Sequence, residues 1–403
     1  ANPPEGVLKE KDGPEWKLKY KMPPESRGDL HALSEVTLPG NPAAPVKVGE
    51  GGVSAITVDE ATGQVSIERQ RAATIYRSAE PANYRTDVCE SGATITQNRA
   101  GLRTQISDNQ GRVFTVSERT EGVPPAALKN VIDKIEGPNG TPKLERSGGE
   151  LSIDANGAFR QLRAPNDEAV YHPDGRLVTT RYTDAARTAK AEITTEIGDG
   201  KTVTDGAGKV SQVFSKVNNE WKPWAPPEAF ANLSFPAGAE GGREVPVPGT
   251  AAITLPDGTT VPRVAGEQLF LREGGALVRR YPAENGRMKE TVYYGNGTRD
   301  ELFNAQIGDP PAPIQYGAKL KGEQIVSVRL PDSAVDTPMN GPADANGVVQ
   351  RAAFVNNEPH GNELVITTEN APGSNKPAVV VALNPSGQAF LIEGTTRKPI
   401  RMR

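Results

Sequence analysis

The side chains that most often carry out chemistry are few in this sequence, and their spacing matches no familiar catalytic pattern. The chain has three His residues and one Cys, Cys89. It contains no HExxH motif, no glycine-rich phosphate loop and no GxSxG turn. A single Cys excludes an intrachain disulfide and a Cys-based zinc site, and a catalytic thiol needs a base close to it in space. We expect Cys89 to be a small buried side chain, and we assign no catalytic residue, metal or cofactor.

Carboxylates are the one abundant reactive group, with 50 Asp and Glu in the chain. Two carboxylates at the right separation can hydrolyse a glycosidic bond, but sequence does not show which of them approach one another. The two Asp-Ala-Asn-Gly segments are similar to the first half of a calcium loop and lack its later ligands and closing Glu. We interpret these segments as turns, and we keep a carbohydrate-active enzyme as an alternative.

Trp221 and Trp224 are candidates for stacking on a sugar or a protein partner. They lie three residues apart in the segment WKPW, on either side of Pro223. Large aromatic side chains also provide much of the buried area in a core or a domain joint. The pair is therefore interpreted in two ways, as a binding platform or as packing between domains.

The elements that must position these residues are β-hairpins, because one short pattern recurs along the chain. An alternating run, a turn with Asp or Asn and Gly, and a second alternating run appear in segments such as LSIDANGAFRQL and VYHPDGRLVTTRY. Asp and Asn bond their own backbone, and Gly adopts positive φ without steric cost. The pattern predicts antiparallel hairpins. The turn-forming residues that it singles out are Asp154, Gly157, Asp174, Gly175, Asp205 and Gly208.

The predicted fold class is all-β, with antiparallel hairpins or meanders in several β domains. The chain has 42 Gly and 35 Pro among its 403 residues, an excess that favours turns over long helices. One helix is predicted near residues 125–136, where apolar residues share a helical face between Pro125 and Gly137.

Clusters of proline suggest the domain boundaries. We expect an extended N-terminal arm at residues 1–50, a hairpin-repeat domain at 51–225, a Pro/Gly-rich linker at 226–249 and a second β domain at 250–403. Clustered proline favours an extended connector.

Charge and hydropathy argue against two classes of partner. The 46 basic and 50 acidic residues are interspersed, so a nucleic-acid footprint is not expected. No apolar run approaches the roughly 18 residues of a membrane helix. The sequence starts at Ala1, as after removal of a signal peptide. We therefore expect a protein that is extracellular or at the cell surface.

The segment Tyr171–Tyr182 resembles the YD repeat of Rhs-type bacterial surface and toxin-shell proteins. Tyr171, Gly175, Arg176, Leu177 and Tyr182 match the repeat's Tyr, its Gly-Arg-Leu turn and the strand leading to the next Tyr. The convincing match covers one repeat of about a dozen residues. The resemblance implies an extracellular array of β-hairpins and no activity.

The functional hypothesis is an exported bacterial structural or interaction protein whose β-repeats form a surface or a filament. Exposed sheet edges can join neighbouring chains by strand addition, and we expect the arm at 1–50 and the apolar segment 376–394 to act in this way. The expected partners are copies of the chain itself or a cell-surface component. The alternative is a secreted carbohydrate-active enzyme or carbohydrate-binding protein on a β-propeller or sandwich.

Overall fold

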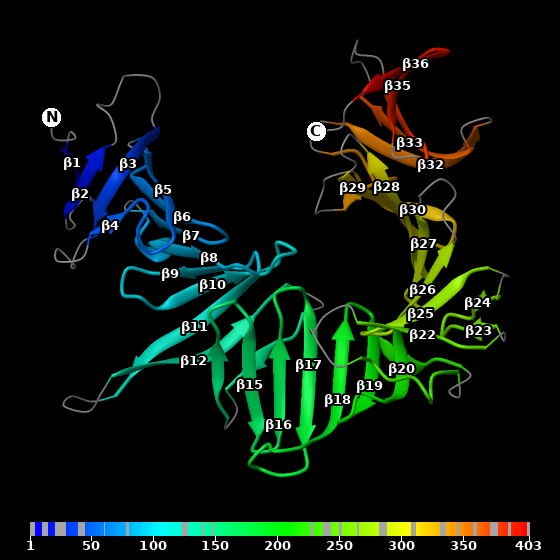
Figure 1. The fold of residues 1–403 in the computed structure, drawn as a ribbon, viewed down its shortest axis with the longest axis horizontal. Helices are drawn as coiled ribbons and strands as arrows, with labels where there is room; N and C mark the ends of the chain where they lie inside the picture. Colours follow the sequence, from blue (N-terminus) through cyan, green and yellow to red (C-terminus); the bar gives the residue numbers. More distant parts are fainter. Residues whose placement is uncertain are drawn as a thin grey trace. The chain divides into compact units, whose positions relative to one another are not determined.

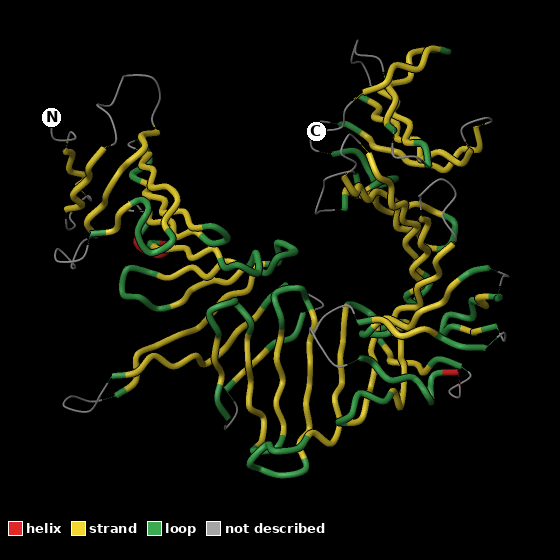
Figure 2. Tube along the Cα trace, in the orientation of Figure 1, coloured by secondary structure: helices red, strands yellow, loops and turns green. Residues whose placement is uncertain are grey.

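The regular secondary structure of the described residues is almost wholly antiparallel β, which confirms the predicted fold class (Figure 1). The structure is a computed structural model. The described helical residues are the 3₁₀ turn Pro81–Asn83 and Ala229. Figure 2 draws helix in red and shows that strands and loops make up the rest of the described trace. The residues that the structure describes are 5–9, 15–20, 30–38, 45–59, 61–77, 80–122, 128–138, 141–146, 149–225, 229–236, 243–249, 252–263, 266–281, 288–307, 312–330, 336–344, 347–357, 361–370, 378–385 and 388–400.

The chain divides into two compact units, of which the first is Ala1–Thr188. One sheet of this unit follows the order β1-β2-β3-β5-β6-β7-β8-β9-β10-β11-β12-β13, with β4 beside β3, and a second group of strands runs from β14 to β17. The strands are β1 (Glu5–Lys9), β2 (Glu15–Tyr20), β3 (Leu30–Thr37), β4 (Val46–Lys47), β5 (Val53–Asp59), β6 (Gln64–Arg69), β7 (Ala73–Arg77), β8 (Arg85–Val88), β9 (Thr94–Gln97), β10 (Arg103–Ser107), β11 (Val113–Glu121), β12 (Lys129–Glu136), β13 (Leu144–Glu145), β14 (Leu151–Ile153), β15 (Phe159–Ala164), β16 (Asp167–Tyr171) and β17 (Arg176–Tyr182).

The second unit, Ala189–Arg403, contains four groups of strands. These are β18 to β21 in order, a sheet in the order β22-β25-β26-β27-β28-β29-β30-β31, the ribbon β23-β24, and a sheet from β32 to β36. The strands are β18 (Lys190–Ile197), β19 (Gly200–Asp205), β20 (Val210–Val217), β21 (Glu220–Pro223), β22 (Glu244–Pro246), β23 (Ile253–Thr254), β24 (Thr260–Val261), β25 (Gln268–Arg272), β26 (Ala276–Tyr281), β27 (Met288–Tyr293), β28 (Thr298–Ile307), β29 (Ala312–Lys321), β30 (Gln324–Arg329), β31 (Thr337–Pro338), β32 (Val349–Asn357), β33 (Gly361–Glu369), β34 (Val379–Leu383), β35 (Ala389–Glu393) and β36 (Thr396–Ile400).

Each unit has its own hydrophobic cores, which follow from the period-two pattern of the strands. In β2 the residues Trp16, Leu18 and Tyr20 are buried and alternate with more exposed neighbours. They pack with apolar residues of β3, β5 and β6. Alternation of this kind places one face of a strand in the core and leaves the other toward solvent.

The helix predicted near 125–136 is wrong, because residues 129–136 form strand β12. Ile132 and Ile135 are three residues apart and both are buried, which in a regular strand would place them on opposite faces. In the pairing with β11, Ser117 lies opposite Lys134 but Glu118 lies opposite Ile132. Asp133 is therefore the extra residue of a β-bulge, and the bulge turns both Ile side chains to the same core.

The domain organisation also differs from the sequence-based division. Residues of the predicted arm at 1–50 pair into the same sheet as β5, and Trp16 and Leu33 lie in its core. Within the predicted linker at 226–249, Phe230, Leu233 and Val247 are buried in a core. The division between the compact units falls at Thr188 rather than in the proline-rich segment.

Candidate functional site

The turn residues singled out by sequence build one recurring five-residue turn. Asp154 and Asp205 each occupy its first position, and their Oδ1 atoms accept backbone N–H bonds from the third and fifth residues at 2.8–2.9 Å. Gly157 and Gly208 occupy the fourth position with φ of +82° and +86°. This is the geometry that Gly adopts at least cost. The Asp carboxylates therefore satisfy backbone N–H groups of the turn, and the Gly residues provide its positive φ.

The turn at Asp174 and Gly175 is a variant with the carboxylate at the third position. Asp174 Oδ1 accepts from the Arg176 N–H at 3.1 Å, and Gly175 has φ of +90°. The Asn109 N–H donates to Pro173 O at 3.1 Å, so the turn 108–112 packs against this one. A Cβ at Gly175 would lie 2.2 Å from Arg112 Nη2. Gly175 therefore serves the packing of two turns as well as its own conformation.

The conspicuous Tyr of the YD-like segment is part of the same joint. Tyr171 is buried, and its hydroxyl donates to Asp108 Oδ2 at 3.2 Å. Burial is the main cause that raises the pKa of Tyr171. The ring stacks on Phe159 with 5.2 Å between centroids. Tyr171 is therefore a core residue that holds a neighbouring turn.

The structure does not bring Trp221 and Trp224 together as a platform. Trp224 is 2% exposed and donates from Nε1 to Ser215 Oγ at 2.7 Å, so it is a packing residue. Trp221 is partly exposed, and Lys201 Nζ lies 4.4 Å from its ring centroid. Lys216 Nζ lies 5.8 Å from the same ring. Cation–π contacts with two lysines already occupy this aromatic surface.

Cys89 is buried and unbonded, in agreement with the sequence-based interpretation. Burial, followed by the nearby carboxylates of Asp87 and Asp154, raises the pKa of its thiol. A raised pKa favours the unreactive protonated form. Among the described residues no cluster of three or more His, Cys, Asp or Glu could hold a metal ion.

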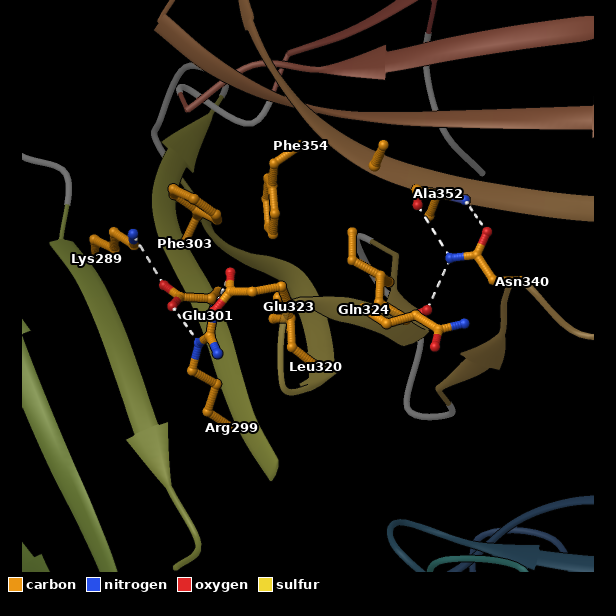
Figure 3. Close-up of a pocket in the computed structure, with 12 residues that line it drawn as sticks. Lys289, Arg299, Glu301, Phe303, Leu320, Glu323, Gln324, Asn340, Ala352 and Phe354 are labelled. Carbon is orange, nitrogen blue, oxygen red and sulfur yellow. Dashed lines mark hydrogen bonds and ion pairs between the residues drawn. The ribbon is translucent and has the colours of Figure 1, made fainter. Parts of the chain in front are cut away.

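A cavity of about 450 Å³ lies in the second unit, between β28–β30 and β32 (Figure 3). Phe303 and Phe354 form its aromatic wall, with Leu320 and Ile325 also lining it. The rest of the lining is polar and includes Lys289, Arg299, Glu301, Glu323, Gln324 and Asn340. Small-molecule sites combine apolar surface with polar groups that fix the ligand's orientation. Sequence reasoning missed this cavity, because its residues come from strands that only the tertiary fold brings together.

The charges at the cavity compensate one another. Glu301 is bound by Lys289 at 2.9 Å and by Arg299 at 3.2 Å, and Arg299 also reaches Glu323 at 3.2 Å. The two cations and two carboxylates cancel. The cavity therefore favours an uncharged ligand that has an apolar face and hydrogen-bonding groups.

Asn340 joins the two sheets at this cavity. Its Oδ1 accepts from the Ala352 N–H at 3.2 Å, and its Nδ2 donates to Ala352 O at 3.1 Å and to Ile325 O at 2.8 Å. Its backbone N–H donates to Gln350 O at 2.8 Å. Asn340 has φ of +57°, which Asn tolerates better than most residues. It thus occupies hydrogen-bonding groups on the outer edge of β32.

Most other strands at the ends of sheets are protected in a different way. Four of them contain proline, at Pro223 in β21, Pro246 in β22, Pro338 in β31 and Pro399 in β36. Proline lacks an N–H and blocks regular pairing on an edge. The end strands β13 and β14 are two and three residues long. Short edges of this kind offer little to an incoming strand.

Strand β1 is the exception among the sheet-terminal strands that the structure describes. It has five residues and no proline, and within the described chain it pairs only with β2. Val7 at its centre is 60% exposed. An unprotected edge with an exposed β-branched residue is a template for an additional strand. β1 is therefore the strongest candidate interaction site, and its EGVLK sequence gave no motif signal.

Comparisons with known proteins add no family: no family model matches the chain, and no curated protein matches it significantly. In the described ranges the longest helix is far too short to cross a membrane.

Proposed function

We propose that this chain is a non-catalytic structural or interaction protein that acts by accepting a β-strand at the edge of β1. The observation that carries the proposal is the contrast between β1 and the other sheet-terminal strands. Proline, short length or Asn340 limits the others, whereas β1 is open in the described structure. Strand addition supplies main-chain hydrogen bonds, and side chains then select the partner.

The use of the buried carboxylates supports a structural role. Glu118 binds Arg103, Glu273 binds Arg243 at 2.6 Å, and Glu363 binds Arg397. A buried carboxylate paired with arginine holds neighbouring strands together, because breaking such a pair leaves an uncompensated buried charge. The proposed location outside the cell rests on the resemblance of Tyr171–Tyr182 to the YD repeat.

Hydrogen exchange on the full chain tests the proposal. The chain purified from the cells that make it is compared with dilute recombinant protein, and protection of the β1 amides is measured in both. We expect extra protection at β1 in the native preparation and none at β36, which carries Pro399. Equal exchange at β1 in the two preparations would overturn strand addition as the function.

A second candidate function is binding of an uncharged sugar in the cavity beside Phe354. The compensated charges and the aromatic wall of Phe303 and Phe354 favour it. A sugar ring has apolar faces that suit aromatic side chains and hydroxyls that suit polar ones.

Titration of the full chain with glucose, galactose and N-acetylglucosamine, followed by nuclear magnetic resonance, tests this second function. We expect saturable binding of at least one sugar, a loss of tenfold or more in affinity in Phe354→Ala, and unchanged affinity in Trp221→Ala; the tenfold figure is an estimate of about 1.4 kcal/mol for one aromatic contact. Lack of binding by all three sugars, or equal binding by Phe354→Ala, contradicts a sugar site here.

A further inference from the structure

We infer that the strand accepted by β1 is β1 of a second copy of this chain, paired antiparallel about a two-fold axis at Val7. This inference rests on the proposed function and names its partner. Its basis is the sequence Glu5-Gly6-Val7-Leu8-Lys9, which is complementary to itself when reversed. With Val7 opposite Val7, Glu5 of each copy lies opposite Lys9 of the other.

The charge pattern of the sheet continues across this contact. In the register of the strands Glu5 lies opposite Lys19, Lys19 opposite Glu35, and Glu35 opposite Lys47. The members Lys19 and Glu35 form an ion pair of 2.9 Å. Opposite charges at directly paired positions stabilise antiparallel strands, and like charges destabilise them. Lys9 of the second copy extends this alternating row by one more strand.

The other end of β1 follows the same rule. Lys9 lies opposite Glu15 of β2, so Glu5 of the second copy adds a further carboxylate beside Lys9. A parallel arrangement of two β1 strands in register would place Glu5 beside Glu5 and Lys9 beside Lys9. Charge therefore selects the antiparallel pairing, in which both ends are complementary.

Symmetry and size set the product of this contact. A two-fold contact uses the same surface on both copies and closes on itself, so it gives a dimer. The surface that a five-residue strand pair buries is smaller than the roughly 1,200–2,000 Å² buried in a stable interface. We therefore expect a dimer that dissociates on dilution.

Charge reversal on the full chain tests the pairing by sedimentation velocity over a wide concentration range. In a pair of Glu5→Lys chains, a Lys at position 5 of each copy lies opposite Lys9 of the other. In a pair of Lys9→Glu chains, Glu5 of each copy lies opposite a Glu at position 9 of the other. We expect each to weaken dimerisation about tenfold, because two cross-strand pairs change from attraction to repulsion. The double variant Glu5→Lys/Lys9→Glu restores opposite charges between copies, and we expect it to dimerise as the unchanged chain does.

The double variant separates this pairing from a local effect on the β1–β2 contact. Both reversals oppose like charges on β2, at Lys19 and Glu15, so a purely intramolecular effect makes the double variant the weakest of the three. Self-pairing is overturned if the double variant dimerises more weakly than both single variants. It is also overturned if the unchanged chain stays monomeric at every concentration. A monomeric chain whose β1 amides are protected in the native preparation would contradict self-pairing while leaving strand addition by another partner in place.

Discussion

At the scale of single residues, the turn glycines differ in what surrounds them, and this difference is measurable. Gly175 and Gly258 have nearly the same φ, +90° and +87°. A Cβ at Gly175 lies 2.2 Å from Arg112 Nη2, whereas a Cβ at Gly258 meets nothing within 4 Å. We predict that Gly175→Val lowers the free energy of unfolding by about 1–3 kcal/mol through strain and displacement of Arg112.

Gly258→Val is the matched control for this prediction, because it carries the backbone strain without the contact. Thermal unfolding of both variants measures the difference, and we expect the greater loss for Gly175→Val. A smaller loss for Gly175→Val would show that the packing of the turns 108–112 and 172–176 contributes nothing.

The carboxylate of Asp300 gives a second prediction at this scale. Asp300 is 5% exposed, and its Oδ2 accepts from the Tyr294 hydroxyl at 2.6 Å, while its buried Oδ1 has no partner in the described structure. Burial raises the pKa of Asp300, against the opposing effect of Lys319. The native state therefore binds the proton more tightly than the unfolded state, and the stability from this group is lost as pH rises through the native pKa.

Asp300→Asn keeps an acceptor for Tyr294 and removes the charge. We predict a higher melting temperature than the unchanged chain at pH 7, and no gain at a pH below 3.8, the pKa that the free side chain has. Melting curves at the two pH values measure this. A variant that is less stable at pH 7 would show that the ionised carboxylate is favourable, through Lys319.

At the scale of elements, a side chain replaces a neighbouring strand at the edge of β32. Asn340→Ala removes three side-chain hydrogen bonds and leaves Ala352, which is 8% exposed, without these partners. We predict a loss of about 2–3 kcal/mol in the free energy of unfolding, from the cost of unsatisfied buried polar groups. Hydrogen exchange of the Ala352 amide reports the loss of this hydrogen bond directly, and we expect faster exchange in Asn340→Ala.

Asn340→Asp is the graded control, because it keeps the acceptor for the Ala352 N–H and loses both donors. We expect slow exchange of the Ala352 amide to survive in this variant even where overall stability falls. Unchanged exchange in Asn340→Ala would contradict the interpretation that this side chain caps the edge.

The elements also show what could be predicted from sequence. The turns at Asp154, Asp174 and Asp205 were predictable, because Asp and Gly there satisfy local backbone requirements that neighbouring residues alone determine. The strand β12 was not, since its spacing of Ile132 and Ile135 depends on a bulge opposite β11. The cavity and the cap at Asn340 were also beyond sequence, because distant strands create them.

At the scale of the whole molecule, the arrangement of edges limits how the chain assembles. The sequence suggested that the segment 376–394 could join neighbours, but its strands β34 and β35 pair on both sides within the sheet β32–β36. The edge of that sheet is β36, which carries Pro399. In the proposed assembly the edge of β1, the one left unprotected among the described sheet-terminal strands, gives a pair of chains. A filament would need two different joints in each chain.

Mixing the two single variants tests this account most directly. Glu5→Lys carries Lys at both ends of β1, and Lys9→Glu carries Glu at both ends, so each variant repels itself and attracts the other across an antiparallel pair. Sedimentation velocity of each variant alone and of the equimolar mixture measures the fraction of dimer. Antiparallel self-pairing of β1 predicts mostly monomer in each separate solution and dimer in the mixture. A mixture that sediments as the sum of its two components would contradict it.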